Sequence, residues 1–266
     1  MTDYYSLVTG SSSGIGKAIA EELARNGNNI ILLARRQDLL NNLSDQLSTS
    51  YNIKTVVLTC DLSDKKSPKY IYEFCKKNDL NVDLVVNNAG YLVGKQFHAT
   101  HEEEEDKAIR VMCNHAVHLT KYFLNDMRER KAGRIMIISS IAAFIPPSNN
   151  WSMLYSAAKS FLVVFGEALN MSYRKEGITT TVVQPGYTIS ELHQQGGIQN
   201  IMNNVPNYMK KSSEYVAKKA VKATFKGKYT CTPGTLNKLI LFLLKNIPNS
   251  WVISLSGKMT GGRYKN

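Results

Sequence analysis

The sequence predicts a single α/β domain, built on a doubly wound parallel sheet with helices on both faces. Short apolar runs alternate with amphipathic helical stretches along most of the chain, and a glycine-rich turn separates the first apolar run from the first helix. Strands that alternate with helices form βαβ units, and the strands of such units pair in parallel. The 266 residues suit one large domain, since no repeat, low-complexity tract or linker divides them.

The expected elements follow one another in a regular order. Strands are expected at residues 5–8, 29–34, 56–60, 82–86, 134–139 and 179–183, and helices at residues 17–26, 39–47, 67–77, 102–130 and 155–176. In such a Rossmann-like sheet, ligands bind at the carboxyl ends of the strands. Residues 188–212 are polar and contain Gly196, Gly197 and Pro206, so we expect an irregular, mobile substrate loop there. Residues 213–266 form a basic, partly apolar C-terminal extension of the same domain, 1–266.

The composition is that of an ordinary globular protein, with 43% hydrophobic and 20% charged residues. We expect no targeting segment, and the strongly apolar stretch at residues 239–244 is too short to span a bilayer. The four cysteines, Cys60, Cys75, Cys113 and Cys231, have neither CxxC spacing nor the density of a disulfide framework. These features predict a cytoplasmic protein with reduced thiols.

The net charge of +12 is concentrated at one end of the chain. Residues 205–266 contain twelve lysines and arginines and a single acid, Glu214, which accounts for +11 of that charge. The same segment contains the apolar run 239–244 and Trp251. Three interpretations remain open: packing against the fold or an oligomer partner, which we favour, a membrane-surface helix, or a docking patch for an acidic carrier protein. No recognition motif accompanies the charge, so nucleic acid is not expected as a partner.

The first chemical motif is the run Thr9-Gly10-Ser11-Ser12-Ser13-Gly14-Ile15-Gly16, between the first strand and the first helix. Phosphates bind to backbone N–H groups at helix N-termini, and glycines leave room for that close approach. The GxxxGxG spacing differs from the general GxGxxG pattern. A tight turn without a ligand is the alternative, but the position in the first βα unit favours dinucleotide binding.

The end of the second expected strand indicates which dinucleotide binds. The chain there reads Leu32-Leu33-Ala34-Arg35-Arg36, with no acid at the tip. NAD sites usually place an acid at this point to hold the ribose hydroxyls, whereas an arginine accommodates a 2′-phosphate. Two arginines at a solvated helix start are the alternative. Next to the glycine turn, they predict NADP(H).

A further pair, Tyr155 and Lys159, lies four residues apart in an expected helix and therefore on one helix face. A nearby cation stabilises a phenolate and lowers the pKa of the tyrosine. Such a pair alone is weak evidence, because surface helices carry similar pairs. Ser139 and Ser140 end a strand upstream, at the ligand-binding edge of the sheet.

Together these motifs resemble the short-chain dehydrogenase/reductase family. The resemblance covers most of the chain and rests on motifs in a fixed order: Thr9–Gly16, Asp61-Leu62, Asn87-Asn88-Ala89-Gly90, Asn114, Ser139-Ser140, Tyr155-Ser156-Ala157-Ala158-Lys159 and Pro185-Gly186. It implies an oxidoreductase that transfers a hydride between NADP(H) and the carbonyl or alcohol carbon of a small, hydrophobic or acyl-type molecule. An NADP-binding sensor or scaffold without turnover is the alternative.

The resemblance also implies roles for individual residues. Tyr155 would be the general acid and Ser140 would hydrogen-bond the carbonyl oxygen. Lys159 would hold the nicotinamide ribose and lower the pKa of Tyr155, and Asn114 would anchor a water that relays protons to Lys159. Besides Tyr155 and Lys159, the cofactor-binding residues would be Gly10, Ser12, Ser13, Gly14, Ile15, Gly16, Arg35, Arg36, Asp61 and Leu62 near the adenine, Asn88, Ala89, Gly90, and Pro185, Gly186 and Thr188 near the carboxamide.

The sequence departs from the family pattern at three points. Ser140 precedes Tyr155 by two residues more than is common, because residues 144–151 look like a short insertion, so Ser139 stays open as an alternative. Ser190 stands where the family has a threonine beyond the Pro-Gly pair. Ser13 stands where some NADP-dependent members have a basic residue, so the NADP(H) prediction rests on Arg35 and Arg36.

Two further expectations concern metals and assembly. His98 and His101 precede a run of four glutamates, but their spacing lacks a recognised zinc pattern, and an acidic helix start explains the glutamates, so no metal is expected. The helices expected at 102–130 and 155–176 correspond to the elements that form the dimer interface in the family. We therefore expect a homodimer or homotetramer, supported by the apolar residues Ile109, Met112, Leu162, Phe165 and Leu169.

Overall fold

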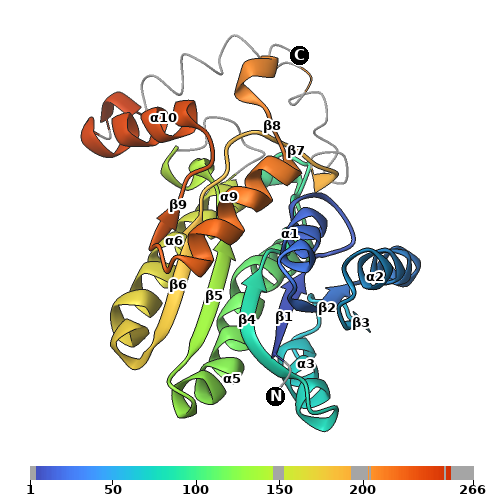
Figure 1. The fold of residues 1–266 in the computed structure, drawn as a ribbon. Helices are drawn as coiled ribbons and strands as arrows, with labels where there is room; N and C mark the ends of the chain where they lie inside the picture. The colour runs from blue at the N-terminus through green and yellow to red at the C-terminus, as the bar shows by residue number, and fades with distance from the viewer. Residues whose placement is uncertain (1–3, 146–152, 193–202, 204, 249, 253–266) are drawn as a thin grey trace.

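The computed structural model describes residues 4–145, 153–192, 203, 205–248 and 250–252 (Figure 1). Within these residues, seven strands form one parallel sheet in the order β3-β2-β1-β4-β5-β6-β9. The strands are β1 (Tyr4–Thr9), β2 (Asn29–Ala34), β3 (Thr55–Thr59), β4 (Asn81–Asn87), β5 (Gly133–Ile138), β6 (Ile178–Val183) and β9 (Thr230–Cys231). The strand order reverses between β1 and β4, and ligands of such sheets bind at the crevice that this reversal creates. The predicted fold class is confirmed.

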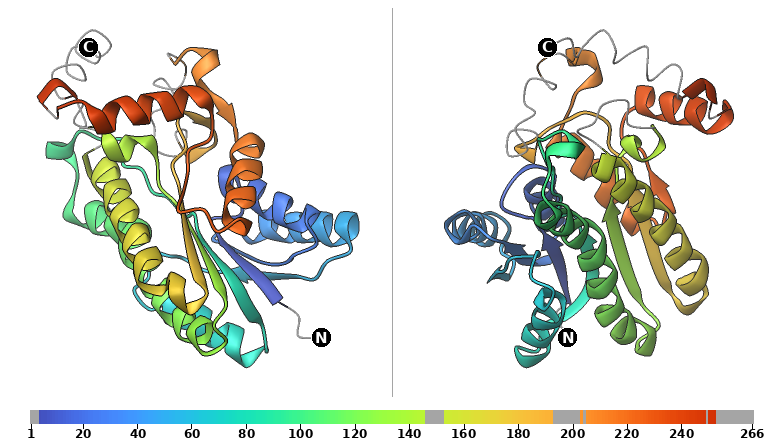
Figure 2. Two further views of the ribbon diagram at one scale, coloured as in Figure 1. Left: turned by 60° about the vertical axis from the view of Figure 1, so that its left-hand side comes forward. Right: turned by 180° about the vertical axis from the view of Figure 1, so that it is seen from behind.

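Helices cover both faces of the sheet (Figure 2). One face carries α1 (Gly14–Arg25), α2 (Gln37–Tyr51) and α9 (Ser213–Phe225), and the other carries α3 (Ser67–Lys77), α5 (His115–Glu129) and α6 (Met153–Tyr173). Because side chains alternate along a strand, Leu7 joins one hydrophobic core and Val8 the other. Strands that are buried on both faces read as unbroken apolar runs, which is why the sequence located them.

The helix expected at residues 102–130 is interrupted. It consists of α4 (Glu102–Ile109), a π-helical turn at Arg110–Asn114, and α5. A π-helical turn inserts one extra residue into the helical repeat, and such turns are frequent at functional sites. Here the turn ends at Asn114, one of the predicted site residues. The helix expected at 155–176 is α6 followed by a short 3₁₀ turn at Arg174–Glu176.

The base of the predicted substrate loop is ordered. Two short strands, β7 (Thr188–Ile189) and β8 (Lys211–Ser212), pair in parallel, and the Ser213 hydroxyl donates to the Ile189 carbonyl over 2.9 Å. A 3₁₀ turn at Asn207–Met209 precedes β8. Gly196 and Gly197, like most of the segment read as an insertion before Tyr155, lie outside the described residues.

The C-terminal region contributes to the domain core and also presents an exposed helix. Val216, Ala217, Ala220 and Val221 of α9 are buried, and β9 extends the sheet beside β6. The following helix, α10 (Thr235–Asn246), lies across the carboxyl edge of the sheet (Figures 1 and 2). The favoured prediction was that the run 239–244 packs against the fold or an oligomer partner, and only part of the run packs against the fold. Leu241 is buried, but Leu239, Phe242 and Leu243 are exposed, because six consecutive apolar residues extend around the whole circumference of a helix.

Three of the apolar residues taken as support for an oligomer interface are not available for one. Met112, Leu162 and Leu169 are 1%, 2% and 8% exposed, so these side chains belong to the protein's own core. The exposed apolar residues of α6 are others, described below. The four cysteines are free thiols, with Cys75 and Cys113 buried. In the described part of the chain, no helix is both long and apolar enough to cross a membrane.

Candidate active site

The turn between β1 and α1 requires its glycines. Gly10 and Gly14 have φ angles of +66° and +56°, a region that residues with a Cβ atom rarely adopt. At Gly16, a Cβ atom would lie 2.2 Å from the Gly10 carbonyl oxygen and 2.4 Å from Nδ2 of Asn88. These contacts press the helix N-terminus against the turn, which directs backbone N–H groups toward the crevice between β1 and β4. This geometry suits a phosphate.

The Asn88 side chain holds two loops together. Its Nδ2 donates to the carbonyl oxygens of Thr9 (2.8 Å) and Gly10 (3.3 Å). The Thr9 hydroxyl in turn donates to the Val86 carbonyl (3.0 Å) and accepts from the N–H groups of Asn88 (2.9 Å) and Ala89 (3.1 Å). The ends of β1 and β4 are therefore cross-linked by side-chain hydrogen bonds. Ala89 and Gly90 follow at the same edge, as predicted for residues that line the cofactor.

Arg36 is joined to the glycine turn. Its guanidinium donates to the hydroxyls of Ser12 (3.1 Å) and Ser13 (2.9 Å), and it forms an ion pair with Glu191 (2.9 Å). Three of these residues were predicted to bind the cofactor, and the structure brings them together as a cluster of donors for an anion. Glu191 was not predicted. It comes from the base of the substrate loop, and a single charged residue far away in sequence gives no signal of this contact.

Arg35 lies on the other side of this corner, near Asp61. Burial works against ionisation of Asp61, but hydrogen bonds from the N–H and hydroxyl groups of Ser63, both 2.9 Å, and the charge of Arg35 hold the pKa of this carboxyl below its usual range. Asp61 is therefore ionised at neutral pH, and Leu62 beside it is buried. Both residues lie at the carboxyl end of β3, where an adenine ring was predicted.

The predicted catalytic residues converge at the end of β5. The Tyr155 hydroxyl is hydrogen-bonded to the side chain of Ser140. Ser140 also accepts from the Ala142 N–H (3.1 Å) and donates to the Pro185 carbonyl (3.3 Å). Ser139 differs, because its buried hydroxyl donates to the backbone carbonyl of Lys159 over 2.7 Å. The geometry thus favours Ser140 as the serine that faces a substrate.

The Lys159 ammonium is buried below the tyrosine. It donates to the Ile138 carbonyl (2.8 Å) and lies 5.5 Å from the centroid of the Tyr155 ring. Burial lowers the pKa of Lys159 to about 8. Burial also raises the pKa of Tyr155 to about 12, against the opposite effect of its hydrogen bond to Ser140. The predicted lowering of the Tyr155 pKa by Lys159 stays a prediction: in this structure the ammonium is directed at the Ile138 carbonyl, and desolvation of the phenolate dominates.

Asn114 ends the π-helical turn with its side chain exposed. No hydrogen bond joins Asn114 to Lys159 among the described residues, so the water relay between them stays a prediction. The preceding residue, Cys113, is 6% exposed and lies close enough to Lys159 for their charges to interact. The π-helical turn therefore does lie beside Lys159.

The Pro185-Gly186 turn connects Ser140, one of the predicted catalytic residues, to the base of the predicted substrate loop. Besides Ser140, the Pro185 carbonyl accepts from the Ile141 N–H over 2.9 Å. The Thr188 hydroxyl donates to the Gly186 carbonyl over 3.0 Å, and Thr188 is buried. These residues lie at the carboxyl end of β6, beside the catalytic group, where the carboxamide of a nicotinamide was predicted.

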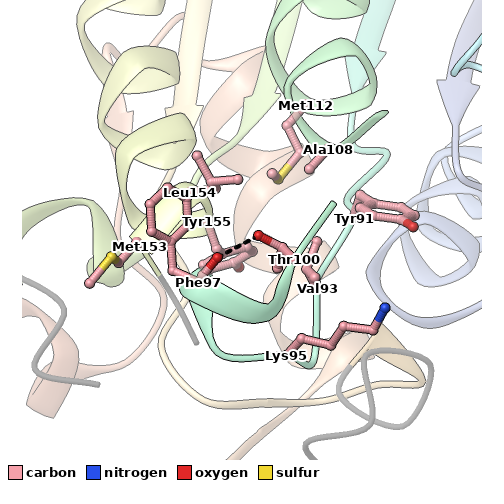
Figure 3. Close-up of a pocket in the computed structure, with 10 residues that line it drawn as sticks. All are labelled: Tyr91, Val93, Lys95, Phe97, Thr100, Ala108, Met112, Met153, Leu154 and Tyr155. Atoms are coloured by element: carbon pink, nitrogen blue, oxygen red, sulfur yellow. Dashed lines mark hydrogen bonds between the residues drawn. The ribbon is translucent and has the colours of Figure 1, made fainter. Parts of the chain in front are cut away.

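A pocket adjoins the tyrosine (Figure 3). About 320 Å³ of space, part of which is open solvent, lies between its lining residues, and most of these are apolar or aromatic. The lining residues come from the segment after β4, from α4 and the π-helical turn, and from the start of α6: Tyr91, Val93, Lys95, Phe97, Thr100, Ala108, Met112, Met153, Leu154 and Tyr155. The Thr100 hydroxyl, the one hydroxyl of the lining besides the tyrosines, donates to the Phe97 carbonyl over 2.7 Å. Only Tyr155 among these was predicted as a site residue.

The two histidines considered as metal ligands lie just before and at the start of α4, with His98 in a short 3₁₀ turn at Phe97–Ala99. His101 is the N-cap residue of α4, and its N–H donates to the Glu104 carboxylate over 3.2 Å. Both carboxylate oxygens of Glu104 also accept from the Lys95 ammonium, each over 2.9 Å. Within the described residues, no three histidine, cysteine or acidic side chains gather in a way that could hold a metal ion.

The doubly wound sheet, the glycine turn at its switch point, and the serine, tyrosine and lysine at the carboxyl end of β5 together are typical of dinucleotide-dependent oxidoreductases. A family model described as short chain dehydrogenase matches residues 5–200, and the chain belongs to this family.

Curated relatives and solved structures agree with this assignment. The chain is 30% identical over 254 residues to a very-long-chain 3-oxoacyl-CoA reductase of Mus musculus, covering 93% of this chain and 76% of that protein. It is equally similar, at 30%, to the 17-beta-hydroxysteroid dehydrogenase type 3 of Mus musculus, over 92% of this chain and 76% of that one. A short-chain dehydrogenase from Sphingobium yanoikuyae, solved in complex with NADPH, has the same fold, with a TM-score of 0.81, 23% identity, and coverage of 92% and 96% of the two chains.

Proposed function

We propose that this oxidoreductase uses NADPH to reduce the keto group of hydrophobic, acyl-type substrates, with 3-oxoacyl thioesters as the favoured class. The observation that carries the proposal is the position of Tyr155. This residue is hydrogen-bonded to Ser140, lies above Lys159, and forms part of the wall of an apolar pocket. A protein that only binds a dinucleotide does not need this combination of features. The combination therefore favours an enzyme over a sensor or scaffold.

The residues of the crevice suit NADPH. The glycine turn supplies backbone N–H groups for a pyrophosphate, and the cluster of Ser12, Ser13 and Arg36 supplies donors for a 2′-phosphate. Asp61 and Leu62 would lie near the adenine. When bound, the cofactor would supply the hydride.

The protein's own groups would handle the proton. The hydroxyls of Ser140 and Tyr155 would both donate to the carbonyl oxygen, which polarises that bond. As negative charge develops on this oxygen, Tyr155 would transfer its proton to it. A pKa of about 12 keeps Tyr155 protonated at neutral pH, and an alkoxide is a much stronger base than a phenolate. The Lys159 ammonium below the ring would then stabilise the phenolate until it is reprotonated.

The lining of the pocket supports the substrate class. Phe97, Met112, Met153 and Leu154 offer apolar contact, while Tyr155 and the neighbouring Ser140 supply polar groups at one end. A pocket of this kind orients a carbonyl by few polar contacts and holds the remainder by burial. The two relatives of equal identity act, by name, on 3-oxoacyl-CoA and on steroids, so both ketone types belong in the test.

The test is NADPH consumption by the purified full chain. The substrates are 3-oxoacyl-CoA thioesters of increasing chain length and a 17-ketosteroid. We expect turnover that increases with acyl length, because a longer chain buries more apolar surface. Tyr155→Phe should retain NADPH binding and lose about 10²- to 10⁴-fold in kcat. NADPH binding without turnover on any substrate would support the sensor instead, and a Tyr155→Phe variant that keeps its rate would mean that another group is the acid.

We further propose that the protein forms a homodimer through α6. Five apolar residues three or four positions apart form a stripe on the exposed face of this helix: Ala157, Phe161, Val164, Ala168 and Met171. The three largest are 44%, 67% and 82% exposed. A helix normally turns polar residues outward, so this stripe favours contact with a second copy. Light scattering at tens of micromolar is the measurement, and a monomer would contradict the proposal.

A further inference from the structure

The outer face of α10 is apolar. Leu239, Phe242 and Leu243 are 55%, 64% and 49% exposed, although they follow the spacing i, i+3, i+4 that usually marks a core-facing stripe. The opposite side of the helix packs inward through Asn237 and Leu241, which are 4% and 8% exposed. The helix thus has one side that packs on the protein and an apolar side that has no partner in the described part of the chain.

The flank of this outer face is basic. Lys238 and Lys245 are exposed and lie seven residues apart, which places both on one side of the helix, next to Phe242. No aspartate or glutamate follows Glu214 in the sequence. The Lys245 ammonium also makes a cation–π contact with Phe144, 4.8 Å from the centroid of the ring.

A second exposed aromatic residue, Trp251, follows the helix in the sequence. Trp251 is 64% exposed, whereas the next residue, Val252, is 3% exposed and holds this segment on the protein. Tryptophan is enriched at membrane–water interfaces because it joins a large apolar ring to one polar N–H group.

The helix is firmly placed next to the catalytic group. A Cβ atom on Gly186 would lie 2.5 Å from Oδ1 of Asn237, so α10 packs directly on the Pro185-Gly186 turn. The Asn237 side chain is fixed by a hydrogen bond to the Pro233 carbonyl, 2.7 Å long. The helix also contacts the short 3₁₀ helix at Ile141–Phe144, which directly follows Ser140. Figures 1 and 2 show α10 at the sheet edge that bears the site.

We propose that the outer face of α10, together with Trp251, docks on the surface of an anionic lipid bilayer. Leucine, phenylalanine and tryptophan would enter the interface between headgroups and acyl chains, and Lys238 and Lys245 would contact the phosphates. A second copy of the chain fits this face less well. A two-fold contact brings the same patch from both subunits together, which would oppose lysines to lysines with no acid to pair them.

This docking would hold the pocket mouth close to the membrane. Phe97 and Met153, which line the pocket, are themselves 44% and 37% exposed. If the proposed function is correct, a long-chain substrate could pass between lipid and pocket with little exposure to water. Only this consequence depends on the proposed function; the docking of α10 does not.

The test is co-sedimentation of the full chain with vesicles of phosphatidylcholine alone and of phosphatidylcholine with phosphatidylserine, at low and moderate salt. We expect binding that requires phosphatidylserine and weakens with salt. In a Trp151→Phe background, the fluorescence of Trp251 should shift to shorter wavelength when these vesicles are added. Absence of binding, or equal binding to both vesicle types, would overturn the proposal.

Variants assign the binding to this face. Leu239→Ser with Phe242→Ser, and separately Lys238→Glu with Lys245→Glu, should each weaken vesicle binding at least tenfold. Tyr70→Ser removes an exposed aromatic residue from α3 and should change nothing. NADPH binding and turnover of a short, water-soluble substrate should be unchanged in all variants, which separates this proposal from the proposed function. If the serine variant binds vesicles normally, or if it instead converts a dimer into a monomer, the face does not bind lipid.

Discussion

The carboxyl edge of the sheet has two halves that are built differently. On the cofactor side, the ends of β1 and β4 are tied by hydrogen bonds of Thr9 and Asn88, and Gly16 lies in backbone contact with Gly10. On the substrate side, the pocket is assembled from side chains of three separate segments around Tyr155. The first half is a backbone structure with little freedom, while the second depends on which side chains happen to line it.

The two halves should therefore recognise their ligands in different ways. Backbone N–H groups recognise a phosphate whatever the neighbouring side chains are, so the turn can stay constant. An apolar pocket discriminates by shape and volume, which change with every lining residue. Substitutions on the two sides should therefore impair different properties of the protein. Five predictions test this, from the largest expected effect to the smallest.

The catalytic centre, where the two sides meet, should be the most sensitive. Ser140→Ala removes a donor to the developing negative charge and should lower kcat about 10²- to 10³-fold. The measurement is steady-state turnover on the best substrate of the proposed class.

Ser139→Ala is the matched control. It removes the buried hydrogen bond to the Lys159 carbonyl and should lower the free energy of unfolding by about 1 kcal/mol while the rate stays within a few-fold. The opposite result, with the rate lost in Ser139→Ala and kept in Ser140→Ala, would reassign the catalytic serine.

On the cofactor side, adding one methyl group to the glycine turn should impair both stability and NADPH binding. In Gly16→Ala the new atom would lie 2.2 Å from the Gly10 carbonyl oxygen, so the turn must shift. We expect a loss of about 1–3 kcal/mol in the free energy of unfolding and an increase of about 10²-fold in the Kd for NADPH. Gly90→Ala places its methyl 3.6 Å from the Leu192 side chain and should leave the free energy of unfolding nearly unchanged. Fluorescence titration measures the Kd and thermal denaturation the stability, and a Gly16→Ala variant that keeps both would contradict the prediction.

The buried ammonium of Lys159 should lower the free energy of unfolding. Burial lowers the pKa of Lys159 from 10.5 to about 8. Between these values the unfolded chain holds more protons, so stability rises with pH through this window, and the full cost of the buried charge is present below it. Lys159→Met should therefore raise the free energy of unfolding by about 2 kcal/mol at pH 7, with a smaller gain near pH 10, while turnover is lost.

Urea unfolding at the two pH values measures this effect. A Lys159→Met variant that is less stable than the parent protein at pH 7 would show that the hydrogen bond to Ile138 outweighs the cost of burying the charge.

The choice of dinucleotide should depend on Arg36. The parent protein should bind NADPH at least about tenfold more tightly than NADH, and Arg36→Ala should remove most of this difference. The reason is that Arg36 is held between Ser12 and Ser13, whereas Arg35 lies near Asp61. Arg35→Ala is the control and should have the smaller effect on the ratio of the two dissociation constants. Equal affinities for both dinucleotides in the parent protein would refute the assignment.

The smallest effect concerns Glu191. Its carboxylate occupies the donors of Arg36 that a 2′-phosphate would use, and both partners are nearly half exposed, with 42% and 45% of their side-chain surface accessible. Glu191→Gln should tighten NADPH binding about two- to fivefold, in line with the modest strength of exposed ion pairs, and leave NADH binding unchanged. Isothermal titration with both cofactors tests this, and weaker NADPH binding would mean that Glu191 orients Arg36 instead.

The parts of the fold that the sequence revealed are those that depend on local pattern. The strands were located to within a residue or two because buried parallel strands are continuous apolar runs, and the helix predicted at 67–77 has the same bounds as α3. The two-residue strands β7, β8 and β9 were not predicted, because at that length pairing with a neighbour, rather than composition, decides the conformation. The π-helical turn has no compositional signal of its own.

The same rule applies to the site. The glycine turn and the Tyr155–Lys159 pair are short, contiguous motifs, and the structure brings them to one edge of the sheet. The pocket lining and the Glu191 contact join residues that are distant in sequence, so no motif encodes them. The effect of burial on the pKa of Tyr155 was not predicted, because sequence shows which charges are near but not how deeply a group is buried. For α10, six consecutive apolar residues could not say which of them would face outward.

The π-helical turn at Arg110–Asn114 changes the direction in which the side chains of the helix point. The segment before the turn can therefore face the pocket, and the segment after it can face the sheet. Upstream of the turn, Ala108 points into the pocket, and downstream Leu119 and Phe123 point into the sheet. One added residue rotates everything after it by about 100°. Deleting a single residue from this turn would restore an ordinary helix, and then only one of the two surfaces could face its partner. The length of this segment, and not merely its composition, is therefore under constraint.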